Sequence, residues 1–133
     1  MTAYAVGQLR DVDLNQGIVD YLHGIDATLA PFKGRFIIHG GRKDALEGRP
    51  DNDLIVIAFP SLEAARGWYA SPTYQALIPL RRQGSKGEVF LIDGVPESHR
   101  ATDILDGQQG WSGQISVGNI DRNPGSRRCR PLA

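Results

Sequence analysis

Apolar and polar residues recur at two different periods along the first part of the chain. Residues 2–9 alternate with a period of two, which is typical of a strand whose two faces have different surroundings. Asp13 is the expected N-cap of a helix of about 16 residues that follows, and Pro31 is expected to end it. The apolar residues of that helix recur every three or four positions and lie on one side of it: Leu14, Ile18, Leu22, Ile25 and Leu29.

Two further apolar runs are too short for core helices and predict strands. The first is "RFIIHGG" from residue 35, and the second is the β-branched run "DLIVIAF" from residue 53, which is typical of a central strand covered on both faces. A second helix is predicted to begin after Ser61 as N-cap and to break at Pro72. Another short helix, bent or ended near Pro79, should follow, and "GEVFLIDGV" predicts the last strand.

The order of these elements predicts a ferredoxin-like fold of the α+β class. Strand, helix, strand, strand, helix, strand is the split β-α-β arrangement, a four-stranded antiparallel sheet with helices on one face only. Both residue sets of the strand at 53–59 are apolar, so the sheet face without helices also needs cover. Because large exposed apolar patches mark interfaces, we expect a homodimer that pairs sheet to sheet.

Composition narrows the classes of partner and site. The 133 residues contain 15 basic and 15 acidic side chains, and this balance disfavours a nucleic-acid partner, which would need a basic excess. The single cysteine, Cys129, can form neither an internal disulfide nor a Cys-rich metal cluster, and no His-carboxylate cluster has metal-binding spacing. With no signal-peptide pattern and no membrane-spanning apolar run, we expect a cytoplasmic protein without a membrane partner, a metal or a cofactor.

The composition changes after residue 95. Residues 96–133 are rich in Gly, Ser, Asn and Arg and contain only scattered apolar side chains. We therefore expect residues 1–95 to form the domain and residues 96–133 to form a tail outside the core, flexible or docked on the partner subunit. In the docked alternative, Trp111, Ile115 and Val117 form a short strand.

His39 is the first candidate for chemistry. It stands between the apolar run and a glycine pair, and a histidine at a strand end can transfer protons near neutral pH. Strict alternation would place His39 on one face with Arg35 and Ile37, and Phe36 on the other. In the alternative interpretation, the histidine caps the strand end through a hydrogen bond to the backbone.

Arg35 and Arg42 are the candidates for holding an anionic group of a ligand. Gly40 and Gly41 could let the backbone approach such an anion, or they could simply supply positive φ angles at a turn. On the first helix, the wheel places His23 far from the apolar stripe, in solvent, and Tyr21 near the stripe's edge.

Aromatic residues cluster around the predicted helix break. Trp68, Tyr69 and Tyr74 could form the wall of a pocket for a small organic ligand, although core filling explains them equally well. Arg66, on the flank of the same helix, could reach an acidic ligand or form a surface ion pair.

Three segments together carry a family likeness: "GRFIIHGGRKDALEG", "LIVIAFPSLEAARGWYASPTYQALIPLRR" and "VFLIDGV". Over residues 2–95 the chain resembles the family called domain of unknown function 1330. The resemblance implies ferredoxin-like subunits that pair as a dimeric α+β barrel. The family pattern often has Arg where His39 stands. The wider superfamily includes cofactor-independent monooxygenases, muconolactone isomerase and haem-degrading enzymes, and this is an analogy of fold only.

These observations lead to one main hypothesis and two alternatives. The main hypothesis is a small-molecule-binding dimeric barrel, an enzyme without cofactor if His39 acts as acid and base. The first alternative is a non-catalytic binding or stress-associated module whose pocket is filled by side chains. The second is haem binding, which the analogy with haem-degrading relatives suggests.

Overall fold

The computed structural model describes residues 1–106 and divides the chain into two units, Met1–Val95 and Pro96–Ala133. In the second unit the described part contains one short 3-10 helix, η2 (Ala101–Asp106). The backbone N–H of Arg100 donates to Oδ2 of Asp103 at 3.0 Å beside this helix. The strand considered for Trp111, Ile115 and Val117 lies outside the described residues.

The first unit contains four strands with helical segments between them. Its elements are, in chain order, β1 (Ala3–Arg10), α1 (Gln16–Leu29), η1 (Ala30–Phe32), β2 (Arg35–His39), β3 (Asp53–Phe59), α2 (Leu62–Ala70), α3 (Pro72–Gln75), α4 (Ile78–Gly84) and β4 (Lys86–Asp93). No helix within residues 1–106 has both the length and the apolar character needed to cross a membrane.

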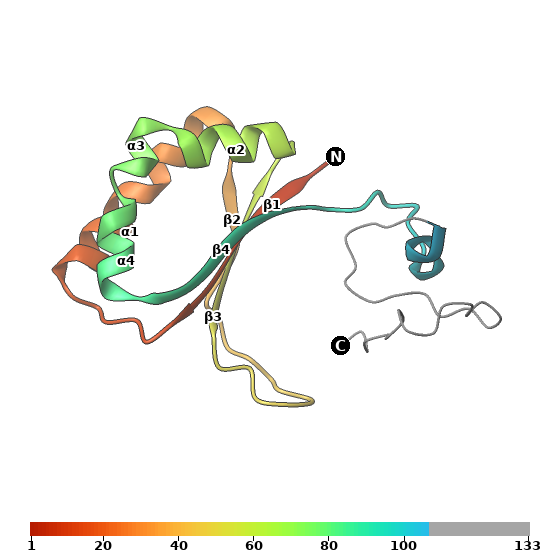
Figure 1. Ribbon diagram of the computed structural model, residues 1–133, viewed down its shortest axis with the longest axis horizontal. Coiled ribbons are helices and arrows are strands. Elements are labelled where there is room, and N and C mark those ends of the chain that lie inside the picture. The colour runs from red at the N-terminus through yellow and green to blue at the C-terminus, as the bar shows by residue number, and fades with distance from the viewer. Residues whose placement is uncertain (107–133) are drawn as a thin grey trace, which may run out of the picture. The chain divides into compact units, whose positions relative to one another are not determined.

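The four strands form one antiparallel sheet in the order β2-β3-β1-β4. β1 lies in the centre, where Ala5 is opposite Ile57 of β3 and Leu91 of β4. Figure 1 shows the helices of this unit gathered on one side of the sheet, with none of them on the other side. This is the predicted α+β, ferredoxin-like fold, and the prediction is confirmed.

Helix boundaries follow local capping, and two of them differ from the prediction. α1 begins after Asn15, not Asp13, because Oδ1 of Asn15 accepts a hydrogen bond from the N–H of Ile18 at 2.9 Å. Ser61 caps α2, as predicted. Pro79 does not end a helix but lies in the first turn of α4. A backbone N–H at that position has no acceptor within the helix, so its absence in proline costs no hydrogen bond.

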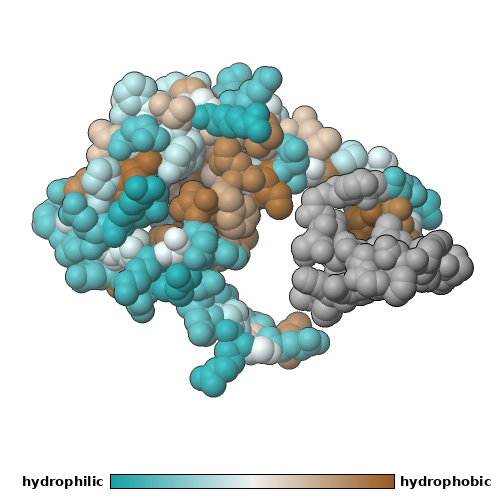
Figure 2. Space-filling model, in the orientation of Figure 1, coloured by the Kyte–Doolittle hydropathy of each residue, from teal (hydrophilic) through white to brown (hydrophobic). Residues whose placement is uncertain are grey.

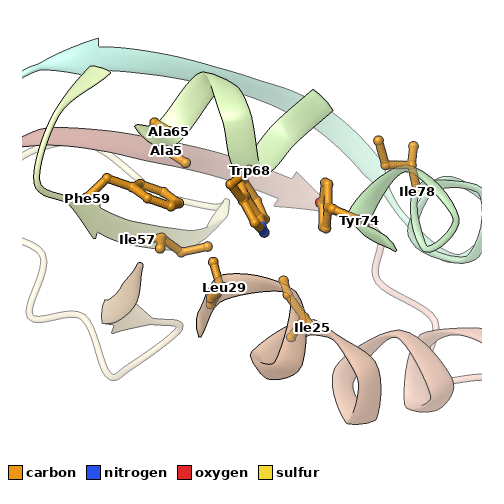
Figure 3. Packing of buried hydrophobic residues seen from close by; sticks show 9 residues of the cluster. All are labelled: Ala5, Ile25, Leu29, Ile57, Phe59, Ala65, Trp68, Tyr74 and Ile78. Carbon is orange, nitrogen blue, oxygen red and sulfur yellow. The ribbon is translucent and has the colours of Figure 1, made fainter. Parts of the chain in front are cut away.

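The core lies between the helices and the sheet and is built around Trp68 of α2. Figure 3 shows its ring between those of Phe59 and Tyr74, with centroid distances of 5.4 Å and 4.1 Å. The indole Nε1–H donates to Oγ1 of Thr28 in α1 at 2.9 Å, and Thr28 in turn donates to the carbonyl of Ile25 at 2.7 Å. The one polar group of the indole is therefore satisfied inside an apolar cluster.

A β-bulge in β2 changes which face its last residues occupy. Phe36 is opposite Ile57 of β3, but Ile38, two residues later, is opposite the next residue, Val56. The extra residue is Ile37, and it reverses the alternation beyond it. His39 is consequently opposite Ile55 and shares the helix-facing side with Phe36, contrary to the alternation expected from the sequence.

The helix-free face of the sheet carries exposed apolar side chains from both edge strands. Ile37 and Ile38 of β2 and Phe90 and Ile92 of β4 are all at least 39% exposed. Figure 2 shows hydrophobic residues at the surface over the strands, whereas the loop between β2 and β3 is mainly hydrophilic.

Candidate functional site

A cavity of about 230 Å³ lies between the sheet and the helices. Two small residues of the central strand β1 leave room there: Ala5 and Gly7 both line the cavity, and Gly7 is opposite Ile55 and Val89. Most of the wall is apolar, and it includes Ile18, Ile25, Ile57 and Phe36. Its polar groups come from His39, Asp53, Tyr21, Tyr74, Trp68 and Arg81.

His39 lies at the rim of this cavity, at the end of edge strand β2. The bulge at Ile37 turns the side chain to the helix side, where the imidazole stacks on the ring of Phe36 with centroids 4.6 Å apart and an interplanar angle of 14°. The residue lines the cavity and is exposed to solvent. An imidazole in this position can contact a ligand on one side and exchange protons with water on the other.

The two arginines that the sequence suggested as anion-holding groups do not line the cavity. Arg35 is opposite Ala58, one position from Phe36, and therefore lies on the helix-free face. Arg42 is exposed in the loop that follows β2. Gly40 and Gly41 have φ angles of 77° and 87°, so they provide the left-handed turn that leads into this loop.

Tyr21 and Tyr74 meet inside the cavity from two different helices. Their hydroxyl oxygens are 2.6 Å apart, within hydrogen-bond distance, and their rings pack edge to face at 6.1 Å. Burial raises the pKa of Tyr21 above its ordinary value, and the contact with Tyr74 raises it further, against an opposing effect of Arg81. Tyr21 is therefore a neutral phenol at physiological pH, able to donate or accept a hydrogen bond.

The remaining candidate residues differ in whether they line the cavity. Trp68 is among the residues that line the cavity. Tyr69 packs against Trp68 and Tyr74 at centroid distances of 6.2 Å and 5.7 Å and supports the wall from behind without lining the cavity. His23 of α1 is exposed and Arg66 of α2 is exposed, and neither lines the cavity.

Arg81 of α4 is the residue that the sequence reasoning missed. It lines the cavity, is only 8% exposed, and lies on the same helix face as buried Ile78, three residues earlier. Burial lowers the pKa of its guanidinium, but Tyr74 and then Tyr21 outweigh this and raise the pKa above its ordinary value. The side chain is therefore a permanent cation. The spacing from Ile78 was the available signal, but the sequence predicted one short helix, bent or ended near Pro79, and not a new helix that begins at Ile78.

The part of the chain that the structure describes contains no group of three or more His, Cys, Asp or Glu residues arranged to hold a metal ion. The cavity thus combines an apolar body, one buried cation next to two neutral phenols, and one imidazole at the rim. Such a site can position a small organic molecule and move a proton on it.

Comparison with known families gives one match that spans most of the chain. Residues 2–95 match the family described as "Domain of unknown function (DUF1330)". None of the curated protein sequences matches the chain.

Several solved structures share the fold at low sequence identity. A dimeric ferredoxin-like protein of unknown function from Jannaschia sp. CCS1 is 13% identical, with a TM-score of 0.55, over 72% of this chain and 100% of that one. The RPA0582 protein of unknown function from Rhodopseudomonas palustris is 15% identical, with a TM-score of 0.54, over 71% and 83%. SnoaB from Streptomyces nogalater, a cofactor-independent oxygenase, is 14% identical over 74% and 96%, with a TM-score of 0.46.

Proposed function

This chain belongs to the family described as domain of unknown function 1330, and we propose that it binds a small organic molecule in the cavity and acts on it without a cofactor through His39. The observation that carries the proposal is the cavity itself, with an imidazole at its rim. The family description assigns no activity, so the support for the proposal is the geometry of the site.

The size of the cavity limits the ligand. An apolar cavity of about 150 Å³ is large enough for benzene. The cavity described here, at about 230 Å³, has room for one ring with a short substituent. Its apolar wall favours a ligand with a hydrocarbon body, and its few polar groups would fix the orientation.

The reaction class that the site supports is proton transfer at a carbon next to a carbonyl group. The imidazole of His39 takes the proton from the C–H bond, and the electron pair of that bond forms the enolate, whose charge is on the carbonyl oxygen. Arg81 and the phenol pair are the cavity groups suited to stabilise that oxygen. Returning the proton to carbon or to oxygen completes the step without an oxidant.

Binding in the cavity is tested by filling it. Gly7 is in β1 on the cavity side, and a Cβ added there would lie 3.8 Å from Cβ of Ile55, so the Gly7→Val side chain fits the strand but occupies the cavity. Gln8→Val, one residue along on the other sheet face, is the matched control. We expect phenylacetone to bind to the wild type and to Gln8→Val and to lose at least tenfold in affinity with Gly7→Val, as measured by calorimetry. Equal affinity for all three proteins would place the ligand elsewhere.

Proton transfer is tested by isotope exchange. In D₂O, we expect the protein to accelerate deuterium incorporation at the carbon next to the carbonyl of bound phenylacetone. Proton NMR measures this incorporation as the loss of the corresponding proton signal. His39→Gln should reduce this rate to that of the buffer, whereas His23→Gln, at an exposed histidine of α1 that does not line the cavity, should leave it unchanged. Exchange that persists in His39→Gln contradicts the assigned role.

A non-catalytic binding module is the second candidate function, and the same pair of measurements separates it from the first. The exposed position of His39 and its stacking on Phe36 are also compatible with a histidine that only orients a ligand. In that case phenylacetone binds and His39→Gln weakens its binding, but exchange does not exceed the buffer rate.

We further propose that two copies of the chain pair through the helix-free sheet face. The support is the apolar surface of Ile37, Ile38, Phe90 and Ile92, which water would otherwise cover, together with the dimeric ferredoxin-like protein of the same fold. Phe90→Glu should yield a monomer in analytical ultracentrifugation, whereas Leu46→Glu, at an exposed apolar residue of the loop after β2, should not. A wild type that sediments as a monomer refutes the pairing.

A further inference from the structure

The cavity contains a buried positive charge without a matching negative one. Arg81 is 8% exposed and its Nε atom is buried without a hydrogen-bond partner within residues 1–106. Its neighbour Arg82, on the outside of the same helix, is exposed. The two arginines therefore have the same charge and opposite surroundings, and only Arg81 lines the cavity.

An unpaired buried cation is unfavourable, because its lost hydration is not replaced. Across the described part of the chain no carboxylate forms an ion pair with Arg81. Asp53, the acidic residue in the cavity wall, is exposed at the start of β3. The phenol oxygens of Tyr21 and Tyr74 offer partial negative charge to the guanidinium, but no full counter-charge.

The hydrogen atoms at this end of the cavity define what can bind there. In the 2.6 Å contact between Tyr21 and Tyr74 one hydroxyl donates to the other, so the second hydroxyl keeps its own hydrogen. The Nε–H of Arg81 is a further donor without an acceptor among residues 1–106. Tyr21, Tyr74 and Arg81 all line the same cavity, so its wall combines phenol and guanidinium donors, and a carboxylate has two oxygens to accept from them.

We propose that the ligand of this cavity is a small monocarboxylic acid whose carboxylate binds Arg81 and the Tyr21–Tyr74 pair, with its hydrocarbon body against the apolar wall. This inference rests on the proposed function, because it requires that the cavity admits a ligand, and it adds the chemical class. The carboxylate of the ligand supplies the negative charge that no carboxylate of the described residues provides to Arg81. Charge-assisted hydrogen bonds of this kind are stronger than neutral ones. A dicarboxylic acid would bury its second charge against Ile18 or Ile57, where nothing pairs with it.

The test compares an acid with a neutral molecule of nearly the same shape. Phenylacetate and phenylacetamide differ in charge and have the single ring that the cavity volume allows. With the full chain at pH 7.5, we expect phenylacetate to bind at least tenfold more tightly than phenylacetamide by calorimetry. Arg81→Met should remove this preference, and Arg82→Met, the adjacent exposed arginine, should retain it.

The outcomes separate the two proposals. If phenylacetamide binds as tightly as phenylacetate in the wild type, or if the preference survives Arg81→Met, the cavity binds ligands without recognising a carboxylate through Arg81, and this inference alone is refuted. If neither compound nor phenylacetone binds at millimolar concentration, the cavity does not admit one-ring ligands and both proposals are refuted. Should Arg81→Met not fold, the wild-type ratio and Tyr74→Phe, which should lower the preference at least threefold, decide the question.

Discussion

The contact between Tyr21 and Tyr74 gives a quantitative test of how the site is built. Their hydroxyl oxygens are 2.6 Å apart, and they join α1 to α3 inside the cavity wall. Replacing either tyrosine by phenylalanine removes one hydroxyl and keeps the ring. Tyr21→Phe, Tyr74→Phe and the double variant form a double-mutant cycle that isolates the energy of this one hydrogen bond.

The expected loss in the free energy of unfolding follows from the burial of the two hydroxyls and from the hydrogen bond between them. A net neutral hydrogen bond contributes about 1 kcal/mol, and a buried hydroxyl that loses its partner costs about 1–3 kcal/mol. Tyr74 is 2% exposed, so its hydroxyl has little access to water when Tyr21 is replaced, and Tyr21 is itself half-buried. We expect each single substitution to lower the free energy of unfolding by about 1.5 kcal/mol and the double substitution by about 2 kcal/mol, a coupling of about 1 kcal/mol.

Urea unfolding followed by tryptophan fluorescence measures these differences. Trp68 is a suitable reporter because its ring centroid is 4.1 Å from that of Tyr74. For a domain of fewer than 100 residues, about 1 kcal/mol also changes Tm by about 4–8 °C, which calorimetry resolves. If the two single effects add within about 0.4 kcal/mol in the double variant, the hydroxyls do not interact and the described site is wrong.

Two other predictions concern stability. Burial raises the pKa of Tyr21, and the contact with Tyr74 raises it further. The phenol therefore keeps its proton in the folded chain, whereas in the unfolded chain it loses the proton at about pH 10. This stabilisation is complete below about pH 10 and is lost as pH rises further, and urea unfolding at pH 9 and 11 should show a smaller decline for Tyr21→Phe than for the wild type. Gly34→Ala should lower the free energy of unfolding by about 1–3 kcal/mol, because the new Cβ would be 2.6 Å from Cε1 of Phe59. Gly7→Ala, with its nearest contact at 3.8 Å, should change the free energy of unfolding by less than about 1 kcal/mol, and a larger loss at Gly7 than at Gly34 would contradict the described packing.

The fold could be predicted because local pattern and global topology agree. The alternation in residues 2–9, the apolar run of β3 and the cap at Ser61 each specify one element, and their order leaves few topologies. The start of α1 could not be fixed, because Asp13 and Asn15 are both good caps, and the contact of Oδ1 of Asn15 with the N–H of Ile18 decides between them.

The site was predictable only in part, because its geometry depends on two local irregularities. The bulge at Ile37 turns His39 to the helix side, away from Arg35. The residues of "RFIIH" give no indication that a bulge occurs there. Arg81 faces the cavity because α4 begins at Ile78, a helical phase that follows from the packing of α1 against α4 more than from the local sequence. The cation that lines the cavity is therefore Arg81, whereas the sequence suggested Arg35 and Arg42, which do not line it.

The most direct test of the account is an amide NMR titration of the full chain with phenylacetate and phenylacetone. The account predicts chemical-shift changes at cavity-lining residues of β1 and directly after β2, including Ala5, Gly7 and Gly40, and their loss in Gly7→Val. Shift changes confined to the helix-free sheet face around Phe90 and Ile92, or no changes at millimolar ligand, would contradict the claim that this cavity is the functional site.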